Sequence, residues 1–150
     1  MNTRLIALLA VCAGLAAAEP AAGAGLFSAT GQVIAILGGD LFVGEAEGHL
    51  NGAGTLTLHL QKDPALTCIG KFTSSAAEGG IGQMQCSDGA TATFHFQRLS
   101  VFRGYGTGDF SRGAMSFAYG LTADEAGPYL KLPAGRKLSQ TSTELKLVDL

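Results

Sequence analysis

Hydrophobic and polar residues alternate at period two along residues 31–120, and glycine-bearing turns interrupt the alternation at short intervals. Leu58 and Leu60, for example, fall on one face of an extended segment, while Thr57, His59 and Gln61 fall on the other. A turn at 62–64 then pairs Leu60 with Leu66. Such alternation is typical of half-buried antiparallel strands. The pattern therefore predicts consecutive hairpins rather than helices.

About eight short strands fit into this region when each is joined to the next by a tight turn. Four of them are expected at 32–37, 41–50, 99–105 and 114–119. An up-and-down meander of this size closes naturally into a barrel, because closure removes exposed strand edges. We therefore predict an all-β antiparallel meander closed as a small barrel. A two-sheet sandwich and an open, repeat-like sheet are the alternatives.

Two cysteines, Cys68 and Cys86, follow the N-terminal apolar run of the chain. The N-terminal run predicts export, as described below, and an even number of cysteines in an exported chain predicts a disulfide. Two free thiols are the alternative. Pairing the two across neighbouring strands sets Gly70 opposite Met84, so a small residue meets a large one on the apolar face. The expected disulfide thus agrees with the expected strand register.

The turn after Cys86 decides which residues share the apolar face. A two-residue turn would place Phe94 and Phe96 on the opposite face from Cys86, because one step of register reverses every side chain. A three-residue loop at 87–89, with Gly89 in the left-handed conformation, keeps both rings on the cysteine's face. We therefore predict the three-residue loop.

The first 18 residues have the layout of a secretory signal peptide. Arg4 precedes an apolar run at 5–17, and small residues at 16–18 resemble a cleavage site. The run is shorter than the ~20 residues that a membrane-spanning helix needs. We predict export to the periplasm or to the outer membrane, with no transmembrane span. The alternative is a lipid-modified Cys12, which would anchor the chain to a membrane.

Downstream of the signal, composition divides the chain into a linker at 19–30, a β domain at 31–121 and a C-terminal extension at 122–150. Thr122 and Glu125 have the spacing of a capping box, which predicts a short helical turn at the start of the extension. Residues 144–150 could supply a last strand.

Composition adds one feature to this picture, because 22 of the 150 residues are glycine. This share is about twice the usual ~7%. We interpret the glycines as turn residues and as small residues that face large ones across neighbouring strands. The formal net charge of −2 gives no electrostatic case for nucleic-acid binding.

The sequence carries no recognisable enzyme motif. No serine is flanked as Gly-x-Ser-x-Gly, the arrangement of a nucleophile elbow. The glycines at 104–108 resemble a phosphate loop but lack the helix that should follow. Glu45 and Glu47 share a solvent-facing strand face without the cleft that acid or base catalysis by a carboxyl pair needs. We therefore predict a non-enzymatic protein.

No cofactor or metal site is predicted either. His49, His59 and His95 all fall on the polar face of the expected strands. His59 and Glu45 could lie side by side, but a zinc site needs further ligands that the pattern does not supply.

One segment has the composition of a binding surface. Arg103, Tyr105 and Arg112 lie among glycines and aromatic residues. Arginine and tyrosine are enriched at binding hot spots, and guanidinium groups suit carboxylate and phosphate partners. We predict that these three residues contact an envelope protein, an anionic glycan or a lipid headgroup. An ordinary solvated hairpin is the alternative.

Three patterns lie in the β region: GEAEGH at 44–49, Cys68 with CSDG at 86–89, and GYGTG at 104–108 ahead of Phe117 and Gly120. In these patterns the chain resembles small exported proteins and lipoproteins of proteobacteria. The resemblance covers about residues 31–132 and implies an envelope location and a β fold. It brings no activity and no site.

The sequence as a whole predicts an exported, non-enzymatic cell-envelope protein that acts as a binding or structural module. It would present loops or the mouth of the barrel to another envelope component. The alternative is a periplasmic inhibitor of a hydrolase such as a lysozyme or protease, with the loop at 74–80 or at 109–113 entering the active site of its target.

Overall fold

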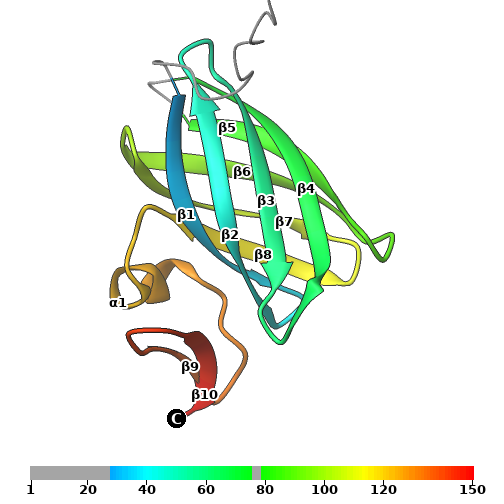
Figure 1. Cartoon of the computed structure of the whole chain (residues 1–150), viewed down its shortest axis with the longest axis vertical. Coiled ribbons are helices and arrows are strands. Elements are labelled where there is room, and N and C mark those ends of the chain that lie inside the picture. The colour runs from blue at the N-terminus through cyan, green and yellow to red at the C-terminus, as the bar shows by residue number, and fades with distance from the viewer. Residues whose placement is uncertain (1–27, 76–78) are drawn as a thin grey trace, which may run out of the picture.

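Eight antiparallel strands close into a barrel in the computed structural model, which describes residues 28–75 and 79–150. Each strand is hydrogen-bonded to the next in chain order, and the first pairs with the eighth (Figure 1). This order confirms the closed up-and-down barrel expected from the alternating pattern. The strands are β1 (Ser28–Leu37), β2 (Asp40–His49), β3 (Ala53–Leu60), β4 (Asp63–Ser75), β5 (Gly79–Cys86), β6 (Thr91–Ser100), β7 (Arg103–Phe110) and β8 (Gly113–Tyr119).

The predicted disulfide is present and joins Cys68 of β4 to Cys86 of β5. Gly70 lies opposite Met84 on the same pair of strands, as the pairing of the cysteines requires. A Cβ atom on Gly70 would lie only 2.8 Å from the Cβ of Met84, so the glycine makes room for the larger side chain. The cysteines and the size complementarity therefore predicted this hairpin correctly.

A three-residue loop joins β5 to β6, as expected. Gly89 has a φ of 88°, a conformation that glycine adopts without strain. The N–H of Cys86 donates to the carbonyl oxygen of Ala90 at 2.7 Å and closes the loop. Phe94 and Phe96 are consequently buried inside the barrel together with the disulfide.

The expected pairing of Leu60 with Leu66 is wrong. Leu60 pairs with Asp63, so β4 begins inside the predicted turn at 62–64. The connection is a two-residue turn, and a register shift next to Leu60 absorbs the additional residues. This irregularity keeps Leu58 opposite the disulfide and preserves the apolar interior.

The expected strand at 99–105 is also wrong, because β6 continues to Ser100 and β7 begins at Arg103. The turn lies in the middle of the predicted strand. The alternating pattern did not predict β7, because glycines rather than large apolar residues occupy the inward positions of this strand. A Cβ on Gly106 would lie 2.7 Å from the Cε1 of Phe117, so the glycine accommodates an aromatic ring rather than forming a turn.

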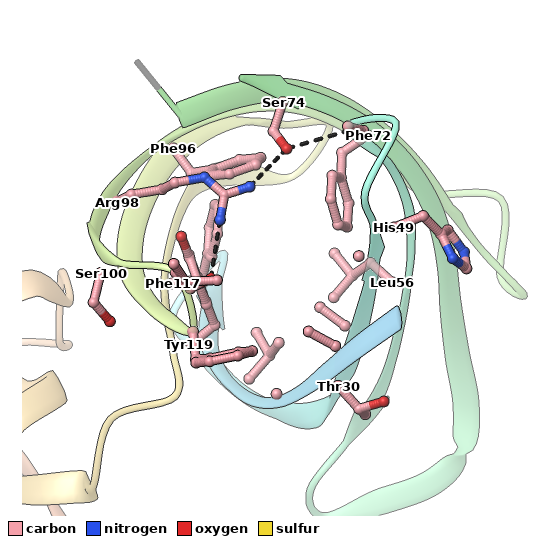
Figure 2. Close-up of a pocket in the computed structure, with 18 of the residues that line it drawn as sticks. Thr30, His49, Leu56, Phe72, Ser74, Phe96, Arg98, Ser100, Phe117 and Tyr119 are labelled. Carbon is pink, nitrogen blue, oxygen red and sulfur yellow. Dashed lines mark hydrogen bonds between the residues drawn. The ribbon is translucent and has the colours of Figure 1, made fainter. Parts of the chain in front are cut away.

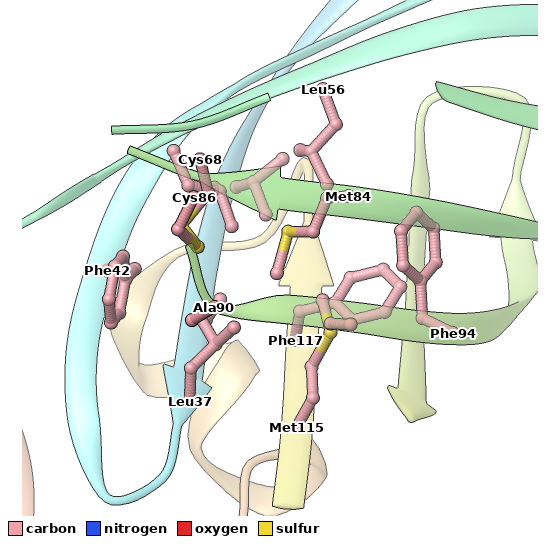
Figure 3. Packing of buried hydrophobic residues seen from close by; sticks show 14 of the residues in the cluster. Leu37, Phe42, Leu56, Cys68, Met84, Cys86, Ala90, Phe94, Met115 and Phe117 are labelled. Atoms are coloured by element: carbon pink, nitrogen blue, oxygen red, sulfur yellow. A yellow bond between two sulfur atoms is a disulfide. The ribbon is translucent and has the colours of Figure 1, made fainter. Parts of the chain in front are cut away.

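Large side chains fill the end of the barrel that holds the disulfide (Figure 3). Leu37, Leu58 and Met115 are among the most completely buried residues of the described chain. Full burial of each such side chain contributes about 1.5–3 kcal/mol to folding. Figure 3 shows the disulfide and Met84 among these apolar groups. This end is therefore a packed core.

The C-terminal extension packs against the outside of the barrel. Its elements are α1 (Ala123–Ala126), the 3₁₀ turn η1 (Gly127–Tyr129), β9 (Arg136–Gln140) and β10 (Leu145–Asp149), where β9 and β10 form a hairpin. The expected capping box is present: Thr122 accepts from the N–H of Glu125, whose carboxylate accepts from the N–H of Thr122. Among the described residues, no helix has the length and apolar character needed to cross a membrane.

A second apolar cluster explains why β1 is hydrophobic on both faces. Ile34 and Ile36 point outward and lie in one apolar cluster with Leu121 and with Ala126 and Leu130 of the extension. A strand covered on both faces has a continuous apolar run rather than an alternating one. Figure 1 shows the extension, in orange and red, beside the barrel.

Candidate functional site

A cavity of about 700 Å³ occupies the end of the barrel opposite the disulfide. Figure 2 shows this end, with side chains from several strands directed toward the central space. The volume is in the range of sites that hold drug-sized molecules, ~300–1,000 Å³. Its inner wall is predominantly apolar and includes Val33, Ala46, Leu56, Phe72, Phe94, Phe96 and Phe117.

Glycines leave this end of the barrel hollow. Gly31 of β1 and Gly48 of β2 line the cavity, and a Cβ on either would meet no atom closer than 3.9 Å. Inward positions of β4, β6 and β8 carry larger residues, and edge-to-face contacts fix the rings. Phe72 and Phe96 have ring centroids 5.4 Å apart, for example. The aromatic side chains of β4, β6 and β8 are therefore fixed on one side of the cavity, and the glycines of β1 and β2 leave space on the other.

Three polar side chains from alternate strands enter this apolar space: Ser74 of β4, Arg98 of β6 and Tyr119 of β8. The guanidinium of Arg98 donates from Nη2 to the Oγ of Ser74 at 2.8 Å and from Nη1 to the carbonyl oxygen of Val101 at 3.0 Å (Figure 2). Ser74 donates in turn to the carbonyl oxygen of Gly52 at 3.2 Å. The Arg98 side chain is thereby held against the cavity wall.

Two polar atoms of this group are buried without a hydrogen-bond partner among the described residues, the Nε of Arg98 and the hydroxyl oxygen of Tyr119. Burial raises the pKa of the Tyr119 hydroxyl above 10.0, and the Arg98 charge opposes part of that effect. Tyr119 is therefore a neutral phenol with a proton to donate. An unsatisfied buried polar group costs about 1–3 kcal/mol, so both atoms would gain from a partner.

The charge of Arg98 is also unbalanced within the described chain. Arg103, Arg112 and Arg136 each lie within ion-pair distance of a carboxylate. Arg98 has no such contact with a described residue, and the described cavity lining holds no Asp or Glu. His49 lies at the rim, and Figure 2 shows its ring pointing away from the cavity. Arg98 therefore makes the cavity locally positive.

Exposed apolar side chains surround the mouth of the cavity. Leu50 lies in the turn between β2 and β3, and the others lie at the turn between β6 and β7. Their exposed fractions are high: Leu50 80%, Leu99 50%, Val101 66% and Phe102 61%. Clustered exposed apolar groups mark ligand or partner sites more often than scattered ones do.

The structure does not bring the three predicted partner-binding residues together. Arg103 and Tyr105 lie at the start of β7 against the extension, whereas Arg112 lies in the turn at its other end. Arg103 pairs with Glu125 at 2.6 Å, and Tyr105 stacks on Tyr129 with centroids 4.2 Å apart. A role for these residues in partner binding stays a prediction.

The pKa values of two carboxyl groups are lowered by their hydrogen bonds and by these arginines. The N–H of Thr122, and then Arg103, lower the pKa of Glu125 below its ordinary value. The N–H of Ala90, and then Arg112, lower that of Asp88. Arg103 and Arg112 are therefore each paired with a carboxylate at the surface of the protein.

The remaining predicted groups are spread over the molecule. His59 contacts the Oγ1 of Thr67 and lies near the carbonyl oxygen of Pro64. Among residues 28–75 and 79–150, no three His, Cys, Asp or Glu side chains gather as metal ligands would. Cys12 and the signal segment lie outside the described residues, as does part of the loop at 74–80.

Ser74, Arg98 and Tyr119 were not predicted as a site. The alternation along β6 could have identified Arg98, because this residue follows Phe94 and Phe96 at the next inward position. A polar residue at an inward position of a barrel strand is itself a sign of a site. No protein-family model, curated protein or solved structure matches this chain.

Proposed function

We propose that this chain is an exported, non-enzymatic binding module of the cell envelope, and that it holds a small, largely apolar molecule in the open end of its barrel. The observation that carries the proposal is the cavity of about 700 Å³. A barrel of eight strands has an interior that side chains just fill, or that holds one small ligand. Here the disulfide end follows the first pattern and the opposite end follows the second.

The lining favours binding of an apolar molecule. Phenylalanine and tyrosine rings form much of the inner cavity wall, from Phe72, Phe94, Phe96, Phe117 and Tyr119, and Phe102 adds another at the mouth. Each Å² of apolar surface removed from water contributes about 25 cal/mol, so a ligand covering these rings gains affinity without a large polar contact. The few polar groups would orient the ligand, which is the usual composition of a small-molecule site.

Export is supported by two independent features. The first 18 residues have the pattern of a signal peptide. The second feature is the buried disulfide between Cys68 and Cys86, because disulfides are typical of proteins that mature in an oxidising compartment.

Filling the cavity tests the proposal. Ala46 lines the cavity, whereas the adjacent Glu45 is exposed on the outside of the same strand. We expect Ala46→Phe to weaken the binding of Nile red, a neutral apolar dye, at least tenfold, because the new ring takes the ligand's place. Glu45→Phe adds the same ring outside and should leave dye affinity unchanged. Fluorescence titration measures both.

Gly48→Leu provides a second filling variant in case Ala46→Phe alters the fold, which circular dichroism would show. A Cβ at Gly48 has open space, with the nearest atom at 3.9 Å. Full dye affinity in both folded filling variants would contradict binding in the cavity.

A further inference from the structure

We propose that the ligand of the cavity is a single-chain amphiphile with an anionic headgroup, bound with its head beside Arg98 and its hydrocarbon chain among the aromatic rings. This inference rests on the proposed function and specifies the class of molecule. It follows from how charge, donors and apolar surface are distributed over the cavity wall.

The headgroup is assigned from the charge of Arg98. A guanidinium cannot lose its proton, so its charge persists wherever it is buried. Arg98 is held at the wall by Ser74 and Val101, and no described carboxylate neutralises it. Arg98 as a whole is half-buried, and a charge that has lost part of its water gains from an opposite charge beside it. An anion in the cavity would supply the missing pair.

Hydrogen-bond donors strengthen this assignment. The Nε of Arg98 is a donor without a described partner, and the neutral hydroxyl of Tyr119 has a proton to give. Both atoms are covered by protein, so the two side chains must turn slightly to present them to the cavity. A carboxylate or phosphate oxygen accepts several hydrogen bonds at once, so one headgroup would then satisfy both. A cationic or purely donating headgroup would leave them unsatisfied.

The hydrocarbon chain is assigned from the depth of the cavity. Arg98 is near the end of β6 at the mouth, whereas Phe94 lies two inward positions deeper on the same strand. Phe94 packs edge-to-face on Phe117, with centroids 5.4 Å apart, and these rings form an apolar wall below the charge. A molecule that is charged at one end and apolar along its length matches this gradient.

The rim suits the same class of molecule. Leu50, Val101 and Phe102 surround the entrance with exposed apolar surface, which would lower the cost of passing a hydrocarbon chain into the barrel.

Three amphiphiles of equal chain length separate the headgroups: dodecanoate, dodecanol and dodecyltrimethylammonium. Isothermal titration calorimetry of the mature protein, below the micelle concentration of each compound, gives the affinities. We expect dodecanoate to bind about ten- to a hundredfold more tightly than dodecanol, because hydrogen bonds to charged groups are the stronger ones. The ammonium compound should bind most weakly. Dodecyl phosphate distinguishes a phosphate head from a carboxylate, and tighter binding than dodecanol by either anion supports the proposal.

Arg98→Met removes the charge and keeps a chain of similar length. We expect it to reduce dodecanoate binding to the level of dodecanol while dodecanol binding stays within about twofold, since the alcohol has no charge to lose. Arg103→Met is the matched control, because Arg103 lies outside the cavity lining and pairs with Glu125. It should leave both affinities unchanged.

The outcomes separate this inference from the proposed function. Equal affinity of the wild-type protein for dodecanoate, dodecyl phosphate and dodecanol would overturn the anionic headgroup while leaving an apolar site in place. This comparison needs no variant, so a folding defect in Arg98→Met does not affect it. If neither the amphiphiles nor Nile red bind, both the inference and the proposed function fail.

Discussion

Glycine and aromatic residues face each other across neighbouring strands inside the barrel. Gly82 lies opposite both Phe72 and Phe94, on the two strands that flank it. A Cβ on Gly82 would lie 2.6 Å from the carbonyl oxygen of Lys71 and 2.7 Å from the Cε2 of Phe94. The ring therefore occupies the volume that a side chain would otherwise need.

The first prediction concerns this contact. Gly82→Ala should lower the free energy of unfolding by about 1–3 kcal/mol, the usual cost of overpacking a filled interior. Gly127→Ala is the matched control, because no atom lies within 4 Å of a Cβ there and its φ is −46°. Urea denaturation measures both variants. Equal stability of the two would show that the ring of Phe94 can move away without cost.

Sequence reasoning recognised some of these residues and missed others. Gly70 opposite Met84 followed from the cysteine pairing, because a known cross-strand pair fixes its neighbours. Gly106 was not predicted as a strand residue, because its partner on β8, Phe117, could be identified only once the strands had been paired.

Among the elements, the hairpin of β4 and β5 is the one that a covalent bond reinforces. Cys68 and Cys86 are 18 positions apart and directly opposite in the ladder. They lie at the packed end, where Leu58 is opposite Cys68 on the neighbouring strand. The disulfide therefore secures the filled end and leaves the cavity end without a covalent cross-link among the described residues.

Replacing both cysteines with alanine should reduce the free energy of unfolding by about 3 kcal/mol, the chain-entropy value for a loop of this size. Denaturation with and without dithiothreitol provides the control: reductant should destabilise the wild-type protein and leave the Cys68→Ala/Cys86→Ala variant unchanged. A loss below about 1 kcal/mol would mean that packing alone holds the two strands together.

The hairpins illustrate what could be predicted for an element. The loop at 87–89 followed from parity, because only one loop length keeps Phe94 inside. The irregular start of β4 could not be predicted in this way, since a register shift can restore the inward and outward alternation after any turn. Leu60 pairs with Asp63 for that reason, although simple counting from the turn indicated Leu66.

At the scale of the whole molecule, the extension covers an apolar face that the barrel alone would expose. Leu130 is 8% exposed and packs in the cluster that includes Ile34 and Ile36. The outer faces of β1 and β8 therefore depend on a segment that follows the last barrel strand. A second apolar cluster, separate from the interior of the barrel, therefore joins the extension to the outer face.

Leu130→Asp should destabilise the whole protein by at least about 3 kcal/mol, because it removes apolar packing and buries a carboxylate. Leu150→Asp places the same group at a position that is 82% exposed and should have little effect. Thermal unfolding followed by circular dichroism compares the two. Similar melting temperatures would show that the extension is not needed for the stability of the barrel.

The sequence by itself determined most strands, most turns and the disulfide, because these depend on residues within one strand or a pair of neighbours. Only the tertiary structure decided between the predicted closed barrel and its open or two-sheet alternatives, and showed that the extension covers β1 and which end stays hollow. It also brought Ser74, Arg98 and Tyr119 together from β4, β6 and β8, which are not neighbours in the ladder. Their convergence depends on the closure and stagger of the whole barrel, and alternation along a single strand does not encode these quantities.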